Sequence, residues 1–202
     1  GRNDTAPCGR FADQPYPGPV YDNLTALYNP GQFFSNSFSL SQTTDNTTFR
    51  IGLRRLDQAG ALTNNDGFWR NTGRVSIDHR IGTKLSIAFT GDHSRSYEDV
   101  VSGNPYTSIL TYPVYVNLAA KGPDGDYLQV PDSTVELENP LWRQGSRDNY
   151  NARSRTQGSL NARWSLLPWV SFDGQFSYDR ADTKQQEYVP KGVPIFDDTD
   201  LV

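Results

Sequence analysis

The sequence has no methionine, one cysteine (Cys8) and two histidines, His79 and His93, among 202 residues. A single cysteine excludes a disulfide framework within the chain, and so few cysteines and histidines give no basis for a zinc site. No run reaches the roughly 18 consecutive apolar residues that a transmembrane helix needs. Because no methionine and no signal peptide precede the body of the chain, we expect a piece of a longer protein.

The sequence also lacks any block of basic residues and any familiar catalytic motif. Its formal net charge is -4 and its isoelectric point is near 5.1, so we expect no nucleic-acid partner. The G-x-S-x-G, H-E-x-x-H and P-loop patterns do not occur in it. We therefore predict that the chain is not an enzyme and needs no cofactor or metal.

Aromatic residues are plentiful, at 12% of the chain, alongside 17 glycines and 13 prolines. This composition is typical of β-structure. In six windows apolar side chains alternate with polar ones, which places the apolar set on one face of a sheet. Helix should be minor, apart from a short turn at Tyr21–Tyr28 capped by Asp22. The predicted strands cover residues 33–42, 47–57, 72–81, 84–97, 150–166 and 169–182.

Connections of two lengths separate these strands. Three short turns join strands one and two, three and four, and five and six, whereas long loops make the other connections. The longest loop, 98–149, far exceeds the usual length of about 4–6 residues. We predict an irregular segment over 1–31 that leads into the sheet, a six-strand segment over 32–182, and a second irregular segment over 183–202.

Two architectures suit six strands with one apolar face: a soluble β-sandwich and the wall of an outer-membrane β-barrel. Three features favour the barrel. Short turns gather at one end and long loops at the other, the polar face carries charges, and aromatics occur at both ends of the apolar bands (Trp164 and Trp169 at one, Phe176 and Tyr178 at the other). The predicted fold class is all-β, with antiparallel strands forming part of a transmembrane barrel. Six strands cannot close such a barrel, in which eight is the practical minimum.

Three stretches of the sequence carry motifs that occur together in one family. The first runs from Tyr21 to Leu62, the second from Arg70 to Phe89 and the third from Asn139 to Asp179. The motif residues are Asp22, Asn23, Tyr28, Gly31, Ser35–Ser41, Asn46, Phe49, Arg50, Leu56, Gln58, Gly60, Arg70, Asn71, His79, Ile81, Trp169, Val170 and Phe172. In this order they resemble the barrel strands of SusC/RagA-type TonB-dependent outer-membrane transporters, and the resemblance covers about residues 20–182. One departure is Arg55 on the lipid-side phase, and no plug domain or TonB box occurs in this sequence.

The resemblance implies part of a bacterial outer-membrane receptor that imports oligosaccharides or peptides. It also implies a SusD-like surface lipoprotein as partner, contact with outer-membrane lipid, and coupling to TonB through parts that this sequence does not contain. Two alternatives remain open at this point. One is a soluble carbohydrate-binding β-sandwich module that uses loop aromatics, and the other is a passive porin wall.

Two sets of side chains are candidates for contact with a solute or partner. Aromatic residues of the long loop suit stacking on sugar rings or contact with a lid protein, or they pack the loop onto itself. Arginines on the polar face suit attraction of an anionic or hydroxyl-rich solute, or they pair with carboxylates of adjacent strands or of a plug. The loop set is Tyr106, Tyr112, Tyr115, Tyr127 and Trp142, and the expected lumen-facing set is Arg50, Arg54, Arg74 and Arg163.

Overall fold

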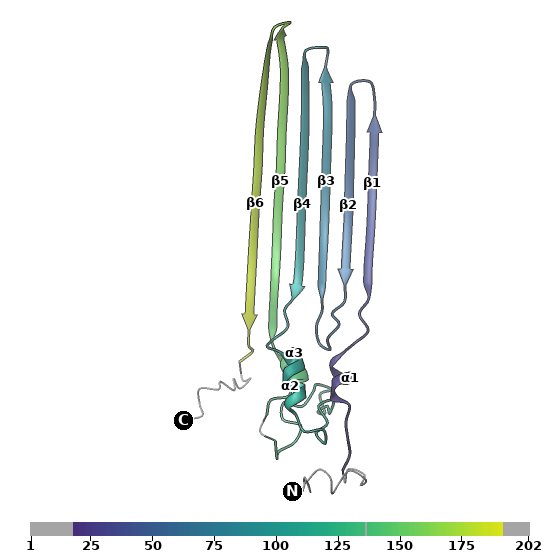
Figure 1. The fold of residues 1–202 in the computed structure, drawn as a ribbon, viewed down its shortest axis with the longest axis vertical. Helices are drawn as coiled ribbons and strands as arrows, with labels where there is room; N and C mark the ends of the chain where they lie inside the picture. The colour runs from purple at the N-terminus through teal and green to yellow at the C-terminus, as the bar shows by residue number, and fades with distance from the viewer. Residues whose placement is uncertain (1–17, 136, 192–202) are drawn as a thin grey trace, which may run out of the picture.

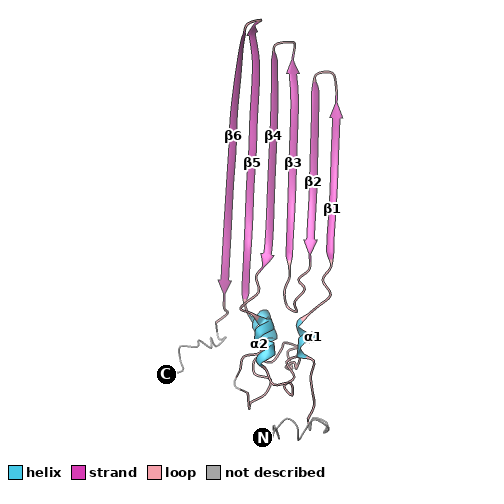
Figure 2. Cartoon of the chain, in the orientation of Figure 1, coloured by secondary structure: helices cyan, strands magenta, loops and turns pink. Residues whose placement is uncertain are grey.

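The computed structural model describes residues 18–135 and 137–191, which form one antiparallel sheet with a small cluster of helices at one end (Figures 1 and 2). The six strands pair strictly in chain order, from β1 to β6. In this part of the chain no helix has the length and apolar character that crossing a bilayer requires. The elements are α1 (Asn23–Leu27), β1 (Phe33–Thr43), β2 (Thr47–Gln58), β3 (Phe68–Ile81), β4 (Leu85–Asp99), α2 (Pro105–Thr111), α3 (Pro140–Ser146), β5 (Asp148–Leu167) and β6 (Val170–Tyr188).

The six predicted strands are all present, and two of them are longer than the alternation indicates. β3 begins at Phe68 rather than at 72, and β6 continues to Tyr188 rather than ending at 182. In the β6 extension both faces carry polar side chains, and the β3 extension begins with two consecutive aromatic residues, Phe68 and Trp69, so the alternation fades in both while the backbone ladder continues. The predicted irregular segment 183–202 is therefore corrected for residues 183–188. Residues 1–17 and 192–202 lie outside the described residues, and α1 occupies the predicted turn with Asp22 as its N-cap.

Turn lengths sort by the end of the sheet. The tight turns at residues 44–46, 82–84 and 168–169 lie at one end, and the loops 59–67 and 100–147 lie at the other end with the helices (Figure 1). Gly67, which closes the first of these loops, has a φ of +81°, and a Cβ there would lie 2.1 Å from the backbone oxygen of Gln58. Only glycine permits so close a return of the chain into β3.

The strand register separates the sheet into two faces. Residues paired across antiparallel strands point to the same side, so each row across the sheet belongs to one face. We call the two sides the apolar face and the polar face. One row of the apolar face contains Phe49, Ile77, Phe89, Leu160 and Phe176, and the adjacent row of the polar face contains Arg50, Ser76, Thr90, Ser159 and Ser177.

No second layer of described residues covers the apolar face. Phe38, Leu53, Ile77 and Trp164 are 59%, 54%, 38% and 47% exposed. A sandwich would bury these side chains together, so the open face argues against that architecture.

The buried hydrophobic core lies instead among the loops and helices. We call this unit the loop cap: α1, residues 59–67 and residues 100–147. Asn23 binds it together, because its side-chain amide donates to the Val116 carbonyl over 2.8 Å and its oxygen accepts from the Leu118 amide over 3.1 Å. The long loop thus has a core of its own. That core consists of Leu27, Ile109, Tyr112, Val116, Leu118 and Leu141.

Candidate functional site

The predicted lumen-facing arginines all lie on the polar face, as the register requires. Arg74 pairs with Asp92 at 3.3 Å, and Arg163 pairs with Asp173 at 2.6 Å, both across neighbouring strands. Arg50 and Arg54, on β2, are exposed and form no ion pair with any described residue. Pairing with adjacent strands therefore accounts for two of the four arginines, and the other two present their guanidinium groups to solvent.

Two open hollows follow the polar face. One, of about 750 Å³, lies near the tight turns, and Asp78, Arg80 and Arg163 contribute to its lining. The other, of about 920 Å³, lies along the middle of the strands, and Arg50 and Asp179 are among its lining residues. Side chains of both charge signs, with serine and threonine hydroxyls between them, suit a solute that both donates and accepts hydrogen bonds.

Helix α2 presents apolar side chains on two sides. Asn104 caps it by accepting from the Thr107 amide over 3.2 Å, and Pro105 occupies its first position. Pro105 and Ile109 are buried in the loop cap, whereas Tyr106 and Leu110, one turn apart, are 46% and 61% exposed. The helix therefore anchors one apolar stripe and displays another.

The predicted loop aromatics fall into three environments. Tyr106 and Tyr115 are exposed, Tyr127 and Trp142 are half-buried, and Tyr112 belongs to the buried core. The Lys121 ammonium lies 4.9 Å from the centre of the Tyr127 ring, a distance that suits a cation–π contact. The structure thus leaves two of the five side chains well exposed and makes Tyr112 a packing residue.

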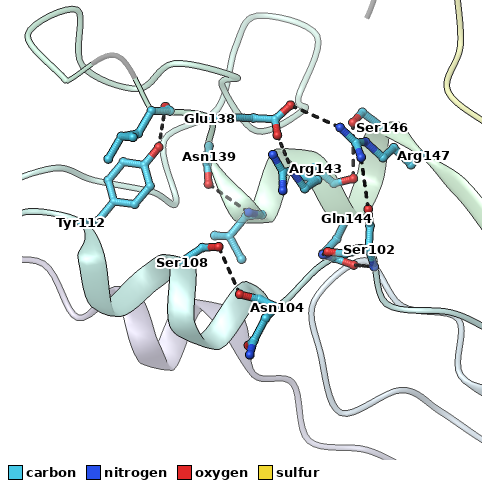
Figure 3. A network of polar contacts seen from close by, with 12 residues as sticks. Ser102, Asn104, Ser108, Tyr112, Glu138, Asn139, Arg143, Gln144, Ser146 and Arg147 are labelled. Carbon is cyan, nitrogen blue, oxygen red and sulfur yellow. Dashed lines mark hydrogen bonds and ion pairs between the residues drawn. The ribbon is translucent and has the colours of Figure 1, made fainter. Parts of the chain in front are cut away.

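The environment of Tyr112 shows why this residue is structural. Its side chain is only 7% exposed, and its hydroxyl donates to the Leu137 carbonyl (Figure 3). Burial, with a smaller contribution from the negative charge of Glu138, raises the pKa of the Tyr112 phenol from 10.0 to about 12. The phenol therefore stays neutral at any physiological pH.

A buried carboxylate organises the loop between α2 and β5. The Glu138 side chain is 2% exposed and accepts from Nε of Arg143, while Arg147 Nη2 lies 3.9 Å from its other oxygen (Figure 3). Ser102 and Gln144 add a reciprocal pair of hydrogen bonds, of 2.9 and 2.7 Å, between the chain after β4 and α3. Charge pairing and amide bonding therefore join α3 to the segments before it within the loop cap.

Asn139 closes the same network. Its side-chain oxygen caps α3 by accepting from the Leu141 amide, and its side-chain amide donates to the carbonyls of Leu118 and Leu128, both over 2.9 Å. The side chain is fully buried. Asn139 thus begins α3 and joins this helix to two other segments of the long loop. These bonds hold the displayed surface of the loop cap in place.

The structure also contains an aromatic ladder that the sequence analysis did not single out. Trp69, Tyr97 and Tyr150 stack in succession on the apolar face near the loop cap, with ring centroids 6.3 and 5.1 Å apart. All three have the phase of the apolar face: Tyr97 and Tyr150 lie at the ends of predicted strands and Trp69 lies just before one. That phase was the available signal. In the described ranges, no group of three or more histidine, cysteine or acidic residues is arranged to hold a metal ion.

Comparison with known proteins supports a fold for this chain but assigns no family to it. No protein-family model matches the chain, and no curated protein matches it. Among solved structures it is similar to the RagAB peptide importer in its "closed-closed" state, with a TM-score of 0.65 and 18% identity over 84% of this chain and 20% of that one. The "open-open" state gives a TM-score of 0.66 and 18% identity over 83% and 19%.

The chain therefore spans about a fifth of the length of the importer chains that it matches. At this identity the likeness concerns the fold alone. The open, antiparallel six-stranded sheet, with few helices, matches a segment of a β-barrel wall. The predicted fold class is confirmed.

Proposed function

We propose that this chain is a wall segment of a SusC/RagA-type TonB-dependent transporter in the bacterial outer membrane. The observation that carries the proposal is the division of one sheet into an exposed apolar face and a charged face. A sheet of this kind suits lipid on one side and a water-filled lumen on the other. The tight turns at one end and the long loops at the other agree with periplasmic turns and external loops.

The polar face supports a solute class for this transporter. Arg50 and Arg54 offer guanidinium groups that lack a carboxylate partner in the described chain, and neighbouring serines and threonines offer hydroxyls. An arginine fork binds carboxylates and other planar acceptors well. Peptides carry carboxylate and carbonyl acceptors, and acidic oligosaccharides carry carboxylates, so both remain within the proposal.

The loop cap supports a protein partner on the external side. Tyr106, Leu110 and Tyr115 expose apolar surface on a rigid scaffold at the end of the sheet that carries the long loops. Exposed aromatic and aliphatic side chains of this kind suit the centre of a protein interface. A SusD-like lipoprotein that covers the external opening is the partner we propose for this surface.

Uptake by whole cells tests the proposed function. Cells with the intact protein, and cells from which its gene is deleted, are given labelled peptides or labelled oligosaccharides, with and without a protonophore. A TonB-coupled importer gives uptake that requires the gene and that falls to background with the protonophore. Gene-dependent uptake that persists after protonophore treatment supports a passive porin instead.

A matched pair of variants connects that uptake to this segment. Arg54→Ser removes a cation from the polar face, and Lys84→Ser removes one from the tight turn between β3 and β4. We expect reduced uptake with Arg54→Ser and wild-type uptake with Lys84→Ser. If the intact protein remains in the soluble fraction of broken cells without detergent, the membrane-wall proposal is wrong.

A further inference from the structure

A groove crosses the apolar face where two paired positions are glycine and therefore have no side chain to fill it. It has a volume of about 550 Å³, and Gly91 and Gly158, paired across β4 and β5, lie beneath it. Ile51, Phe89 and Phe176 are among its walls. Its surface is almost wholly apolar, so it suits a hydrocarbon chain better than a polar group.

This groove opens into a second hollow with a different character. The second hollow, of about 430 Å³, shares Leu53, Gly73 and His93 with the first, so the two are continuous. Toward the loop cap it is lined by Arg55 and Arg95. The continuous depression is thus apolar toward the tight turns and basic toward the loops.

The basic end has the geometry of an anion site. Arg55, Asn71 and Arg95 occupy one row on three consecutive strands, so Asn71 separates the two cations. Arg55 is held by Asp57 at 2.7 Å and by Asn71 at 3.5 Å. Arg95 is exposed and forms no ion pair within the described ranges. Arg95 therefore supplies the cation without a carboxylate partner, and Arg55, which is bidentate with Asp57, supplies its remaining N–H donors to a phosphate between them.

We propose that this depression binds a phosphate-bearing membrane lipid, with an acyl chain over Gly91 and Gly158 and the phosphate between Arg55 and Arg95. The inference rests on the proposed function, because it needs the apolar face to lie against the membrane. The depression has an apolar section at one end and arginines at the other. This combination suits a molecule with both a hydrocarbon chain and an anionic group. A hydrocarbon alone leaves Arg95 without a counter-ion, and a free phosphate leaves the groove unfilled.

Lipid titration of the intact detergent-solubilised protein, followed by native mass spectrometry, tests this site. The probes are dimyristoylphosphatidic acid, dimyristoylglycerol with the same acyl chains and no phosphate, and inorganic phosphate. We expect phosphatidic acid to bind at least tenfold more tightly than the diacylglycerol, and inorganic phosphate to compete poorly. Equal affinity for the two lipids, or full competition by inorganic phosphate, overturns the proposal.

Three variants separate the two ends of the site. Arg95→Ser should weaken phosphatidic acid at least tenfold and leave the diacylglycerol unchanged. Gly158→Val should weaken both lipids, and it fits the fold because a Cβ there meets only the Thr90 oxygen, at 3.6 Å. Gly52→Val adds the same side chain to the polar face, where a Cβ meets nothing within 4 Å, and should change neither affinity.

The outcomes distinguish failure of the lipid site from failure of the proposed function. If Gly158→Val and Gly52→Val have the same effect on binding while uptake and detergent dependence are retained, the lipid site is wrong and the transporter wall stands. If the protein needs no detergent at all, the wall itself is wrong.

Discussion

At the scale of single residues, neighbours along one strand face different surroundings. Phe89 lies on the apolar face opposite Ile77 and Leu160, whereas Ala88 lies on the polar face opposite Asp78 and Asn161. A side chain placed at one position meets lipid in the proposed barrel, and one placed at the next position meets water and a carboxylate.

This difference gives the first prediction. Phe89→Arg should lower the free energy of unfolding of the intact barrel by roughly 2–4 kcal/mol, because a cation is costly on the lipid face of a barrel. Ala88→Arg, on the polar face, is the control and should cost far less. Ser76→Arg would be a poorer control, because it would place a second arginine opposite Arg50. Urea unfolding in lipid vesicles measures both values, and equal losses would contradict the assignment of the faces.

The second residue-scale prediction concerns pH. Because the pKa of Tyr112 is raised from 10.0 to about 12 in the folded loop cap, the folded state holds this proton more tightly than the unfolded state does. The resulting stabilisation is complete below about pH 10 and is lost as the pH rises toward 12. Tyrosinate absorbance should therefore show a late-titrating phase, whose amplitude Tyr112→Phe reduces. The exposed Tyr106→Phe should leave the late phase in place.

At the scale of elements, the strands and α1 were predicted from the sequence, whereas α2 and α3 were not. Alternation is local, so six strands can be recognised from neighbouring residues alone. The loop cap depends on contacts between distant segments, such as those of Asn23 with Val116 and of Asn64 with Leu141. A pattern among neighbouring residues does not predict contacts between segments so far apart in the sequence.

One local signal for these helices was available all the same. Both α2 and α3 begin with an Asn-Pro pair, Asn104-Pro105 and Asn139-Pro140, in which asparagine caps the helix and proline takes its first position. The candidate residues divide in the same way. Register places Arg50 and Arg54 on the polar face, as alternation predicts, whereas the burial of Tyr112 depends on the three-dimensional packing of the loop cap.

The third prediction tests the carboxylate that holds the loop cap together. Glu138→Ala leaves Arg143 and Arg147 without their counter-ion in a largely buried place, which should cost roughly 3 kcal/mol. Hydrogen exchange should accelerate across α2 and α3 and remain slow in the β3–β4 hairpin. Glu98→Ala, at an exposed position on the polar face, is the control and should change neither region. Uniform acceleration over the whole sheet would contradict a separate loop cap.

At the scale of the whole molecule, the strands are longer than a bilayer requires. β5 has 20 residues and β6 has 19, whereas a tilted strand crosses with about 9–11. On β5 and β6 the apolar rows occupy the part near the tight turns, and the part near the loop cap carries mostly polar side chains on both faces, apart from Tyr150 of the aromatic ladder. In the proposed barrel the sheet therefore extends beyond the membrane on the external side and supports the loop cap there.

The last prediction concerns how the described sheet achieves stability. Its apolar face is open, and β1 and β6 are edge strands with unpaired backbone groups on their outer sides. Such a surface associates with other chains in water, and the loop cap lies at one end of the sheet and leaves this face exposed (Figure 1). Residues 1–202 expressed alone should aggregate in water and gain strand structure only with detergent or lipid. Circular dichroism with size-exclusion chromatography measures this, and a folded monomer in plain buffer would show that the apolar face is not a lipid-facing surface.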